Sequence, residues 1–236
     1  MSDILENGLK KIGLPEEIIK EACPKLEQYI QEIVLYNSAF NLTNTSDHDE
    51  LVTRHLLDSL AAYNVLNGIF ENARESTGDT ESSDVEPPEN AREITVGDIG
   101  SGGGLPGIPL ATCFPDIQFK LVERMEKRCA FLENCAALLG LKNVEVVNSE
   151  AERFPESSLD VATFRAFRPL DKKMTKTLLR LVRNGGYLAA YKAKKDNIIE
   201  EMNAIKALVP EYEVFKLEVP GLEENERNLV IIKKGE

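Results

Sequence analysis

The sequence predicts an α/β protein built on a doubly wound parallel sheet, with a small helical domain in front of it. Over residues 14–66, apolar residues recur at three- and four-residue spacing, which is typical of amphipathic helices. From residue 93 onward, strand-like stretches alternate with helix-like ones, the pattern of parallel strands joined by crossover helices. The stretch 211–234 instead holds two strand-like runs around a turn-rich loop, which predicts an antiparallel hairpin at the end of the sheet.

The helical part is expected to form an N-terminal domain over residues 1–70. Its apolar pattern divides into three helices, over residues 14–23, 25–40 and 47–66. Ser46 or Asp47 is placed to cap the third helix, and Glu50 lies in its first turn, where a carboxylate favours the helix dipole.

Residues 71–93 are expected to be a flexible insertion between two domains. They hold eight acidic residues against two arginines, a net charge of −6, which is half of the chain's formal charge of −12. The stretch also contains Pro87-Pro88 and few apolar residues, so it cannot bury enough surface to offset the entropy of ordering it.

Residues 94–236 are expected to form the second domain, which carries the sheet. Its strand-like stretches lie at residues 93–100, 119–124, 144–150, 160–167 and 186–192. Because the carboxyl ends of parallel strands meet at one edge of a sheet, side chains that follow these strands are candidates for a shared site.

Composition bounds the class of protein. The first twenty residues carry seven charged side chains, and no stretch reaches membrane-spanning length, so we expect a cytoplasmic protein without a membrane partner. Four cysteines without a CxxC pair and two histidines suggest neither a metal site nor a disulfide framework, and the thiols are expected to be reduced. We also expect a monomer.

A glycine-rich segment over residues 98–107 follows a predicted strand and opens a predicted helix. Gly100 and Gly102 are candidates to let the backbone approach a cofactor closely. The spacing of Gly102, Gly104 and Gly107 also satisfies the GxGxxG pattern of dinucleotide sites, so the glycines alone leave a nicotinamide or flavin cofactor, or a tight turn without a ligand, as alternatives.

Two acidic residues favour S-adenosylmethionine over a dinucleotide. Asp98 stands two residues before the first glycine, where a carboxylate would repel pyrophosphate but attract the cationic methionine part of S-adenosylmethionine. Glu123 ends the next strand, where it could accept hydrogen bonds from ribose hydroxyls of either cofactor. After the third strand, Ala151 and Glu152 lie where an adenine ring would be, although they could be an ordinary helix start.

One segment is strongly basic in this acidic protein. Residues 165–195 hold ten lysines and arginines against one acid, a net charge of +9. The side chains expected to meet RNA phosphates are Lys172, Lys176, Arg180, Arg183, Lys194 and Lys195. The first four recur at spacings that place them on one helix face, opposite apolar residues, although such a face can also be simply solvated. Arg165 and Lys192 are expected closer to the reaction.

Several short motifs together resemble one family of rRNA methyltransferases. They are NLT at 41–43, RHLLDSL at 54–60, GLPGIPL at 104–110, EKR at 126–128, SEAERFP at 149–155 and RAF at 165–167. The sequence resembles ribosomal small-subunit methyltransferase G, also called glucose-inhibited division protein B, from about residue 26 to residue 234. The resemblance implies a Rossmann-like class I methyltransferase fold and S-adenosylmethionine-dependent methylation of N7 of one guanine in 16S rRNA of the small ribosomal subunit.

The resemblance also implies cofactor contacts. By position in the motifs, they would come from Gly100, Leu105, Ala151, Glu152 and Arg165. The chain departs from the family's usual pattern at Gly103, at Phe164 and at Lys192-Ala193. In RHLLDSL, Arg54 and Asp58 could pair on one helix face, or the helix could cover the cofactor cleft.

The expected chemistry needs no general base. N7 of neutral guanine already carries a lone pair, so positioning it in line with a methyl group can supply about 7–11 kcal/mol of the barrier. Arg165 and Lys192 are therefore predicted to act by positioning, and His55 is expected to be a buried, hydrogen-bonded histidine rather than a proton carrier. The alternatives are an NAD(P)-dependent oxidoreductase and a non-catalytic rRNA-binding or ribosome-binding protein with a methyltransferase fold.

Overall fold

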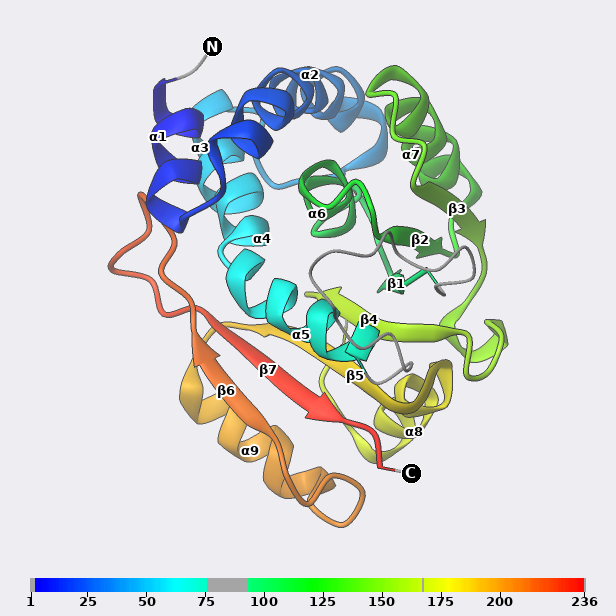
Figure 1. Cartoon of the computed structure of the whole chain (residues 1–236). Helices are drawn as coiled ribbons and strands as arrows, with labels where there is room; N and C mark the ends of the chain where they lie inside the picture. Colours follow the sequence, from blue (N-terminus) through cyan, green and yellow to red (C-terminus); the bar gives the residue numbers. More distant parts are fainter. Residues whose placement is uncertain (1–2, 76–92, 167, 236) are drawn as a thin grey trace, which may run out of the picture.

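Seven strands form one sheet in the computed structural model, which describes residues 3–75, 93–166 and 168–235 (Figure 1). The sheet order is β3-β2-β1-β4-β5-β7-β6. The strands are β1 (Thr95–Ile99), β2 (Gln118–Glu123), β3 (Val144–Asn148), β4 (Leu159–Arg165), β5 (Val182–Lys192), β6 (Glu213–Lys216) and β7 (Asn228–Lys233). β1 to β5 pair in parallel, whereas β7 is antiparallel to both β5 and β6. The predicted parallel sheet with an antiparallel C-terminal hairpin is confirmed.

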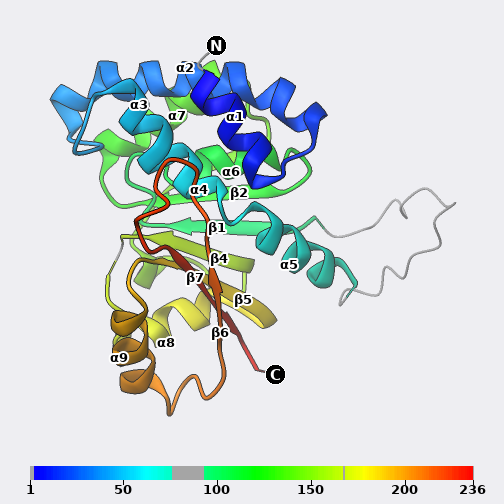
Figure 2. The ribbon, with the colours of Figure 1, turned by 90° about the vertical axis from the view of Figure 1, so that its left-hand side faces the viewer.

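Helices cover both faces of this sheet (Figures 1 and 2). One face packs against the chain's first helices together with α6 (Gly107–Cys113) and α7 (Glu126–Leu138), and the other face packs against α8 (Lys172–Leu181) and α9 (Lys195–Ile205). Alternation within the strands supports both layers: in β4, Val161 belongs to the first core and Ala162 to the second. A short 3-10 turn, η2 (Ala151–Arg153), follows β3.

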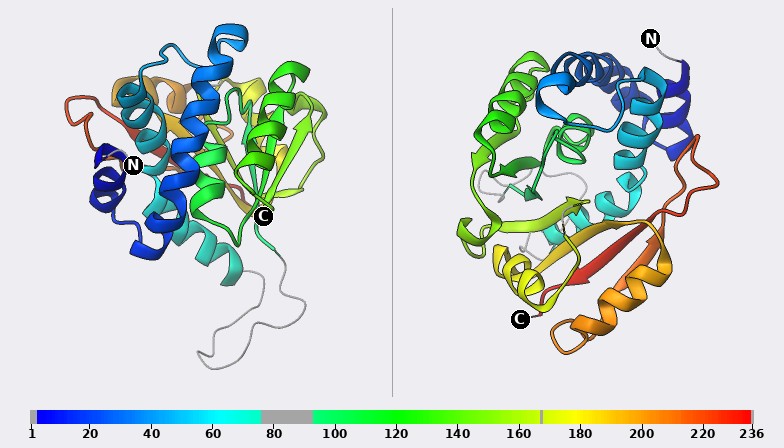
Figure 3. Two further views of the ribbon diagram at one scale, coloured as in Figure 1. Left: turned by 90° about the horizontal axis from the view of Figure 1, so that it is seen from above. Right: turned by 180° about the vertical axis from the view of Figure 1, so that it is seen from behind.

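The first helices are α1 (Asp3–Ile12), α2 (Glu16–Phe40), α3 (His48–Leu51), the π-helical turn η1 (Val52–Leu57), α4 (Asp58–Leu60) and α5 (Tyr63–Glu75). Seen from above, α2 crosses the molecule beside α6 and α7 (Figure 3). Asp47 caps α3 by accepting a hydrogen bond from the backbone N–H of Glu50 over 2.9 Å, so the predicted cap is confirmed for Asp47.

All three predicted helices were wrong in their bounds. The predicted helices over 14–23 and 25–40 are one continuous helix, because α2 runs through Pro24. Burial of Cys23, Leu26 and Ile30 along one face offsets the backbone hydrogen bond that proline removes. The helix predicted over 47–66 is interrupted by the π-helical turn at its centre.

The N-terminal helices share one continuous core with the sheet. Leu5 of α1, Leu26 of α2 and Phe119 of β2 belong to the same cluster of buried side chains. Tyr63 of α5 stacks on Phe114 with ring centroids 4.5 Å apart. The division into domains at residues 70 and 94 stays a prediction, and the acidic insertion expected over 71–93 falls mostly outside the described residues. Within the described ranges, no helix is long and apolar enough to span a membrane.

Candidate active site

The glycine loop lies between β1 and α6, at the carboxyl edge of the sheet. Gly100, Gly102 and Gly104 have φ values of +73°, +60° and +92°, which favour glycine over residues with a side chain. The backbone N–H groups of Gly100 and Ser101 donate to the carbonyl of Val122, so the loop folds back onto the end of β2.

The side chain of Asp98 holds this loop in place through hydrogen bonds. Its Oδ2 accepts hydrogen bonds from Ser101 Oγ over 2.7 Å and from the backbone N–H of Gly107 over 3.0 Å. Burial raises the pKa of its carboxyl to about 6. Asp98 lines neither of the two cavities at this edge of the sheet, so in this structure its side chain serves to hold the loop in place.

Glu123 stands at the end of β2 and faces a cavity of about 300 Å³. Its Oε2 accepts from the backbone N–H of Gly102 over 2.9 Å, and its Oε1 accepts from that of Met125 over 2.8 Å. The side chain is buried. Further walls of this cavity come from Gly100, Ala151 and Glu152. Four residues predicted to contact a cofactor are thus brought together.

A second cavity of about 360 Å³ lies beside the first, and Ala166 and Arg168 line both. We call it the substrate cavity; its walls include the side chains of Asp58, Phe164, Arg165, Tyr191, Lys192 and Arg227. Ala166 has a φ of +50°, an unusual value for a residue with a side chain, at the point where the chain leaves β4 between the two cavities.

Arg165 connects the end of β4 to the π-helical turn. Its Nη1 donates to Asp58 Oδ2 over 2.6 Å and to the carbonyl of Arg54 over 3.3 Å. Its Nη2 lies 3.2 Å from His55 Nδ1. Arg165 thereby lines the substrate cavity rather than the cavity beside Glu123.

Of the two alternatives for the RHLLDSL segment, the ion pair between Arg54 and Asp58 is not formed. Arg54 Nε lies 3.7 Å from Glu50 Oε1, whereas Asp58 pairs with Arg165 and with Arg227. The RHLLDSL segment instead contributes one wall of the substrate cavity. His55 is a hydrogen-bonded, largely buried histidine, and burial together with the charge of Arg165 lowers its pKa to about 4.

Lys192 ends β5 and is paired. Its Nζ lies 2.6 Å from Glu201 Oε2, and the same oxygen accepts a hydrogen bond from the backbone N–H of Leu170. Phe164 and Ala193, two of the departures from the family pattern, line the same substrate cavity.

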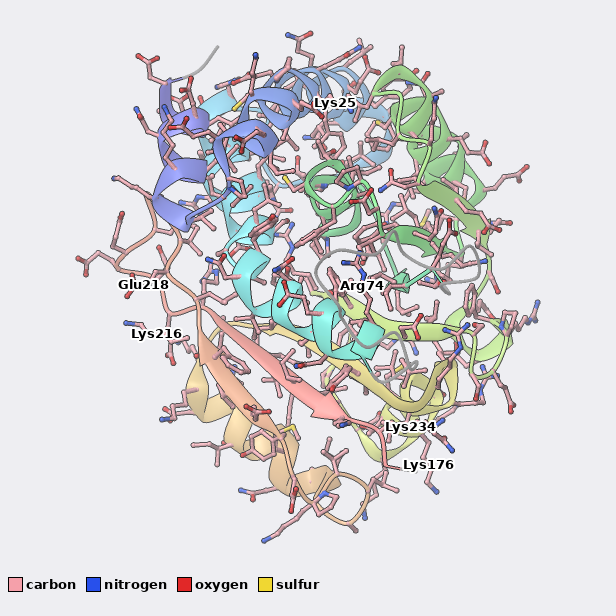
Figure 4. All side chains as sticks on the ribbon, in the orientation of Figure 1. Lys25, Arg74, Lys176, Lys216, Glu218 and Lys234 are labelled. Carbon is pink, nitrogen blue, oxygen red and sulfur yellow. The ribbon has the colours of Figure 1, made fainter. Side chains whose placement is uncertain are left out.

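The four lysines expected to meet RNA phosphates lie on two helices. Lys172 and Lys176 are exposed on α8, and Lys176 extends away from the molecule (Figure 4). Lys194 and Lys195 are exposed at the start of α9.

Two arginines differ from the single basic face that was predicted. Arg183 lies in β5 and pairs with Asp160 over 2.8 Å, because the helix ends at Leu181. Arg180 donates through Nη2 to the carbonyls of Ala151 and Glu152, each over 3.1 Å, so it supports the wall of the cavity beside Glu123.

Two other predicted residues, Leu105 and Gly102, line neither cavity. Leu105 is buried in the core under the loop, and Gly102 faces Glu123 with its backbone. Arg227, which was not predicted as a site residue, donates to Asp58 from 169 residues away in the chain. No local signal marked it, since it lies in an acidic, turn-rich segment.

The cavity beside Glu123 suits an adenosine-containing cofactor. Each oxygen of Glu123 accepts one backbone hydrogen bond and keeps a second lone pair for a ribose hydroxyl. Within the described ranges, no group of three or more histidine, cysteine or acidic side chains is arranged to hold a metal ion, and all four cysteines are free and buried.

This sheet order, with a glycine loop after β1 and a buried carboxylate at the end of β2, defines the class of S-adenosylmethionine-dependent methyltransferases. An Aquifex aeolicus structure described as a SAM-dependent methyltransferase superposes with a TM-score of 0.50 at 19% identity, covering 79% of this chain and 93% of that one. The chain belongs to the family GidB, rRNA small subunit methyltransferase G, whose sequence profile matches residues 22–74 and 83–230.

Relatives of known name agree over nearly the whole length. The ribosomal RNA small subunit methyltransferase G of Treponema denticola is 40% identical over 98% of this chain and 94% of its own length. That of Neisseria meningitidis serogroup B is 34% identical over 98% of this chain and 97% of its own. Fold and family together make the chain a methyltransferase with S-adenosylmethionine as methyl donor, which sets aside the oxidoreductase and the non-catalytic alternatives.

Proposed function

We propose that this enzyme methylates N7 of one guanine in 16S rRNA of the small ribosomal subunit. The observation that carries the proposal is the meeting of two cavities at Ala166 and Arg168, one beside the Glu123 carboxylate and one lined by cationic side chains. The first would hold the methyl donor and the second the target nucleotide. We further propose that the enzyme works as a cytoplasmic monomer without a metal ion.

The cavity beside Glu123, which we call the donor cavity, is assigned to the adenosyl part of S-adenosylmethionine. Glu123 would accept from the ribose hydroxyls, and Ala151 and Glu152 would flank the adenine ring. Gly100 leaves the loop open to the ligand, while Asp98, Gly102 and Leu105 would act by shaping the loop. When bound, the cofactor supplies an electrophilic methyl group on a sulfonium.

The substrate cavity combines positive charge with apolar walls, as a nucleotide with its phosphate requires. Arg165 and Lys192 line it, and Phe164 and Tyr191 provide ring surfaces. Arg165, held by Asp58 and His55, is assigned the role of fixing the base position, and Lys192 that of orienting the base from the end of β5.

No side chain needs to remove a proton from the nucleophile, since guanine N7 attacks through its lone pair. His55 fits this mechanism: its lowered pKa and its contact with Arg165 make it a neutral hydrogen-bond acceptor near pH 7. Positioning by the two cavities would then supply most of the catalysis, on the order of 7–11 kcal/mol.

Exposed lysines of α8 and α9 are assigned to RNA phosphates. Lys172 and Lys176 of α8 form one group, and Lys194 and Lys195 at the start of α9 form another. Arg180 and Arg183, already engaged with Ala151, Glu152 and Asp160, would contribute their charge rather than free donors.

The proposal is tested by nucleoside analysis of small-subunit rRNA. Small subunits from cells lacking the gene are incubated with the purified enzyme and S-adenosylmethionine carrying a labelled methyl group, then digested to nucleosides. We expect one labelled 7-methylguanosine per subunit. Label in a different nucleoside, or in large-subunit rRNA only, would contradict the proposal.

A further inference from the structure

Asp58 joins two arginines that come from separate segments of the chain. Its Oδ2 accepts from Arg165 Nη1 over 2.6 Å, and its Oδ1 accepts from Arg227 Nε over 2.8 Å. The Asp58 side chain is only 8% exposed, and all three side chains line the substrate cavity. Because each carboxylate oxygen binds one arginine, Asp58 fixes the two guanidinium groups relative to each other.

This Arg165–Asp58–Arg227 cluster carries excess positive charge. One carboxylate faces two guanidinium groups, and His55, which also contacts Arg165, is neutral near pH 7. Lys192 in the same cavity is balanced by Glu201 at 2.6 Å. The cluster is therefore a half-buried cationic site within a protein whose net charge is −12.

Arg227 keeps a terminal nitrogen available to a ligand. Its Nε is used by Asp58 and its Nη1 donates to the carbonyl of Glu226 over 2.9 Å, while in the described part of the chain its Nη2 makes no hydrogen bond. Arg165 uses both terminal nitrogens on Asp58, Arg54 and His55. Arg227 is also more exposed than Arg165, at 28% against 14% of the side chain.

The reaction decides which part of the nucleotide this donor fits. Methyl transfer to N7 places positive charge on the guanine base. Arg165 is already assigned to the base, and Asp58 is the one carboxylate shared by both arginines, so a second guanidinium beside the base would add uncompensated charge and oppose the reaction. Beside a phosphate, the Arg227 guanidinium would stabilise the bound substrate throughout the reaction. Resting on the proposed function, we infer that Arg227 binds a phosphate of the target nucleotide and that Asp58 is the positioning residue that holds its guanidinium at the substrate cavity.

The test compares Arg227→Ala and Arg227→Lys with a matched control, Lys120→Ala. Lys120 lies in β2, pairs with Glu145 over 2.8 Å, is 32% exposed and lines neither cavity, so its loss changes the net charge equally. For each variant, KM and kcat are measured on unmethylated small subunits. Affinity for the small subunits is measured from 50 to 300 mM KCl, roughly the range over which salt screens phosphate contacts. Affinity for S-adenosylmethionine is measured by calorimetry.

Arg227→Ala should raise KM for the small subunit about tenfold or more and leave kcat and cofactor affinity within about twofold, because a phosphate contact is equal in ground and transition states. It should also reduce the magnitude of the salt slope by about 0.7–0.9, the amount for one phosphate contact. Arg227→Lys should restore the slope but only part of the KM, since lysine keeps the charge without the fixed geometry. Lys120→Ala should match the wild type.

Asp58→Asn tests the positioning role. We expect it to raise KM for the small subunit in the presence of Arg227 and to raise it less in the Arg227→Ala background, because the two residues act together. If Asp58→Asn does not fold, the Arg227 variants decide alone.

An unchanged KM and salt slope in Arg227→Ala, or a fall of kcat at constant KM, would overturn the inference. Absence of methylation by the wild-type enzyme would instead overturn the proposed function.

Discussion

Asp98 accepts a hydrogen bond from the backbone N–H of Gly107 over 3.0 Å, which ties the end of β1 to the first residue of α6. A Cβ atom added at Gly107 would lie 2.6 Å from Asp98 Oδ2 and 2.4 Å from Leu121 Cδ2. The glycine is therefore required by close packing, and the loop that forms the donor cavity depends on this hydrogen bond.

Gly107→Ala should destabilise the protein by about 1–3 kcal/mol, the usual cost of overpacking a buried position. Urea unfolding measures the change, which corresponds to a fall in Tm of roughly 2–4 °C per kcal/mol for a chain of this size. The matched control is Gly68→Ala in α5, where a Cβ meets nothing within 4 Å. The control should be neutral or more stable by about 1 kcal/mol, because alanine favours helix.

Asp98 should also give stability a measurable pH dependence. Burial raises its pKa in the folded state to about 6, above the ordinary value of 3.8, so the folded protein binds this proton more tightly than the unfolded chain. The contribution to stability is then fully present below about pH 4 and is lost as pH rises through 6, by up to about 3 kcal/mol.

Asp98→Asn isolates this contribution, since asparagine keeps an acceptor for Ser101 and Gly107 but does not titrate. Free energies of unfolding from urea titrations at pH 4 to 8, taken as wild type minus variant, should decrease with pH across this window. A difference that stays constant or increases with pH would show that the carboxyl is not held at a raised pKa.

The local pattern of apolar and polar residues was enough to predict the sheet, because each strand is a short apolar run that ends at a polar residue or a glycine. The glycine loop and Glu123 follow such strands, so their convergence at one edge of the sheet could be predicted from topology alone. Helix α1 was missed because Gly8 interrupts its pattern; there α1 packs so closely on the π-helical turn that a Cβ would lie 2.4 Å from Leu57 Cδ1.

The residues that could not be predicted depend on interactions between distant segments. Arg227 meets Asp58 across 169 positions, and nothing near either residue in the sequence indicates the other. Asp98 was expected to face the methionine part of the cofactor, but its side chain is 1% exposed beneath the loop, and which side of a strand end a carboxylate faces is decided by packing. The roles assigned to these residues in binding stay predictions.

Gly100→Val should abolish binding of S-adenosylmethionine, because the side chain would enter the donor cavity at a residue whose φ is +73°. Calorimetry measures the affinity. Gly185→Val is the matched control: its φ of +75° imposes the same backbone strain, but a Cβ there meets nothing within 4 Å and the residue lines neither described cavity. If both variants lose the cofactor equally, strain rather than occupancy of the cavity is responsible.

Glu123→Ala should weaken S-adenosylmethionine binding roughly 10- to 100-fold, the range for losing hydrogen bonds to a charged acceptor. The hydrogen bonds that Gly102 and Met125 donate to this carboxylate would disappear as well, so calorimetry is paired with urea unfolding. Cofactor affinity that is unchanged in a folded variant would reject the assignment of this cavity.

The charge reversal Lys172→Glu with Lys176→Glu should weaken binding to the small subunit and leave cofactor affinity unchanged, since both side chains are exposed on α8. For every phosphate that the variant no longer binds, the magnitude of the salt slope should fall by about 0.7–0.9. Lys11→Glu with Lys20→Glu, on exposed positions of α1 and α2, makes the same change in net charge as a control. Equal salt slopes for the two double variants would make α8 ordinary solvated surface.

Lys192→Ala should affect turnover more than binding, in contrast to the lysines of α8. Lys192 lines the substrate cavity at the end of β5 and is held by Glu201 at 2.6 Å, a geometry suited to orienting a base and poorly suited to collecting phosphate from solution. We expect kcat on unmethylated small subunits to fall roughly 10- to 100-fold with KM changed less than about threefold, since the lysine would matter mainly once the base is in line with the methyl group. Glu201→Gln, which leaves the lysine charged but frees it from its partner, should lower kcat by a smaller factor. The salt slope should remain that of the wild type in both variants. A shallower slope with an unchanged kcat would place Lys192 on the RNA backbone instead of beside the base.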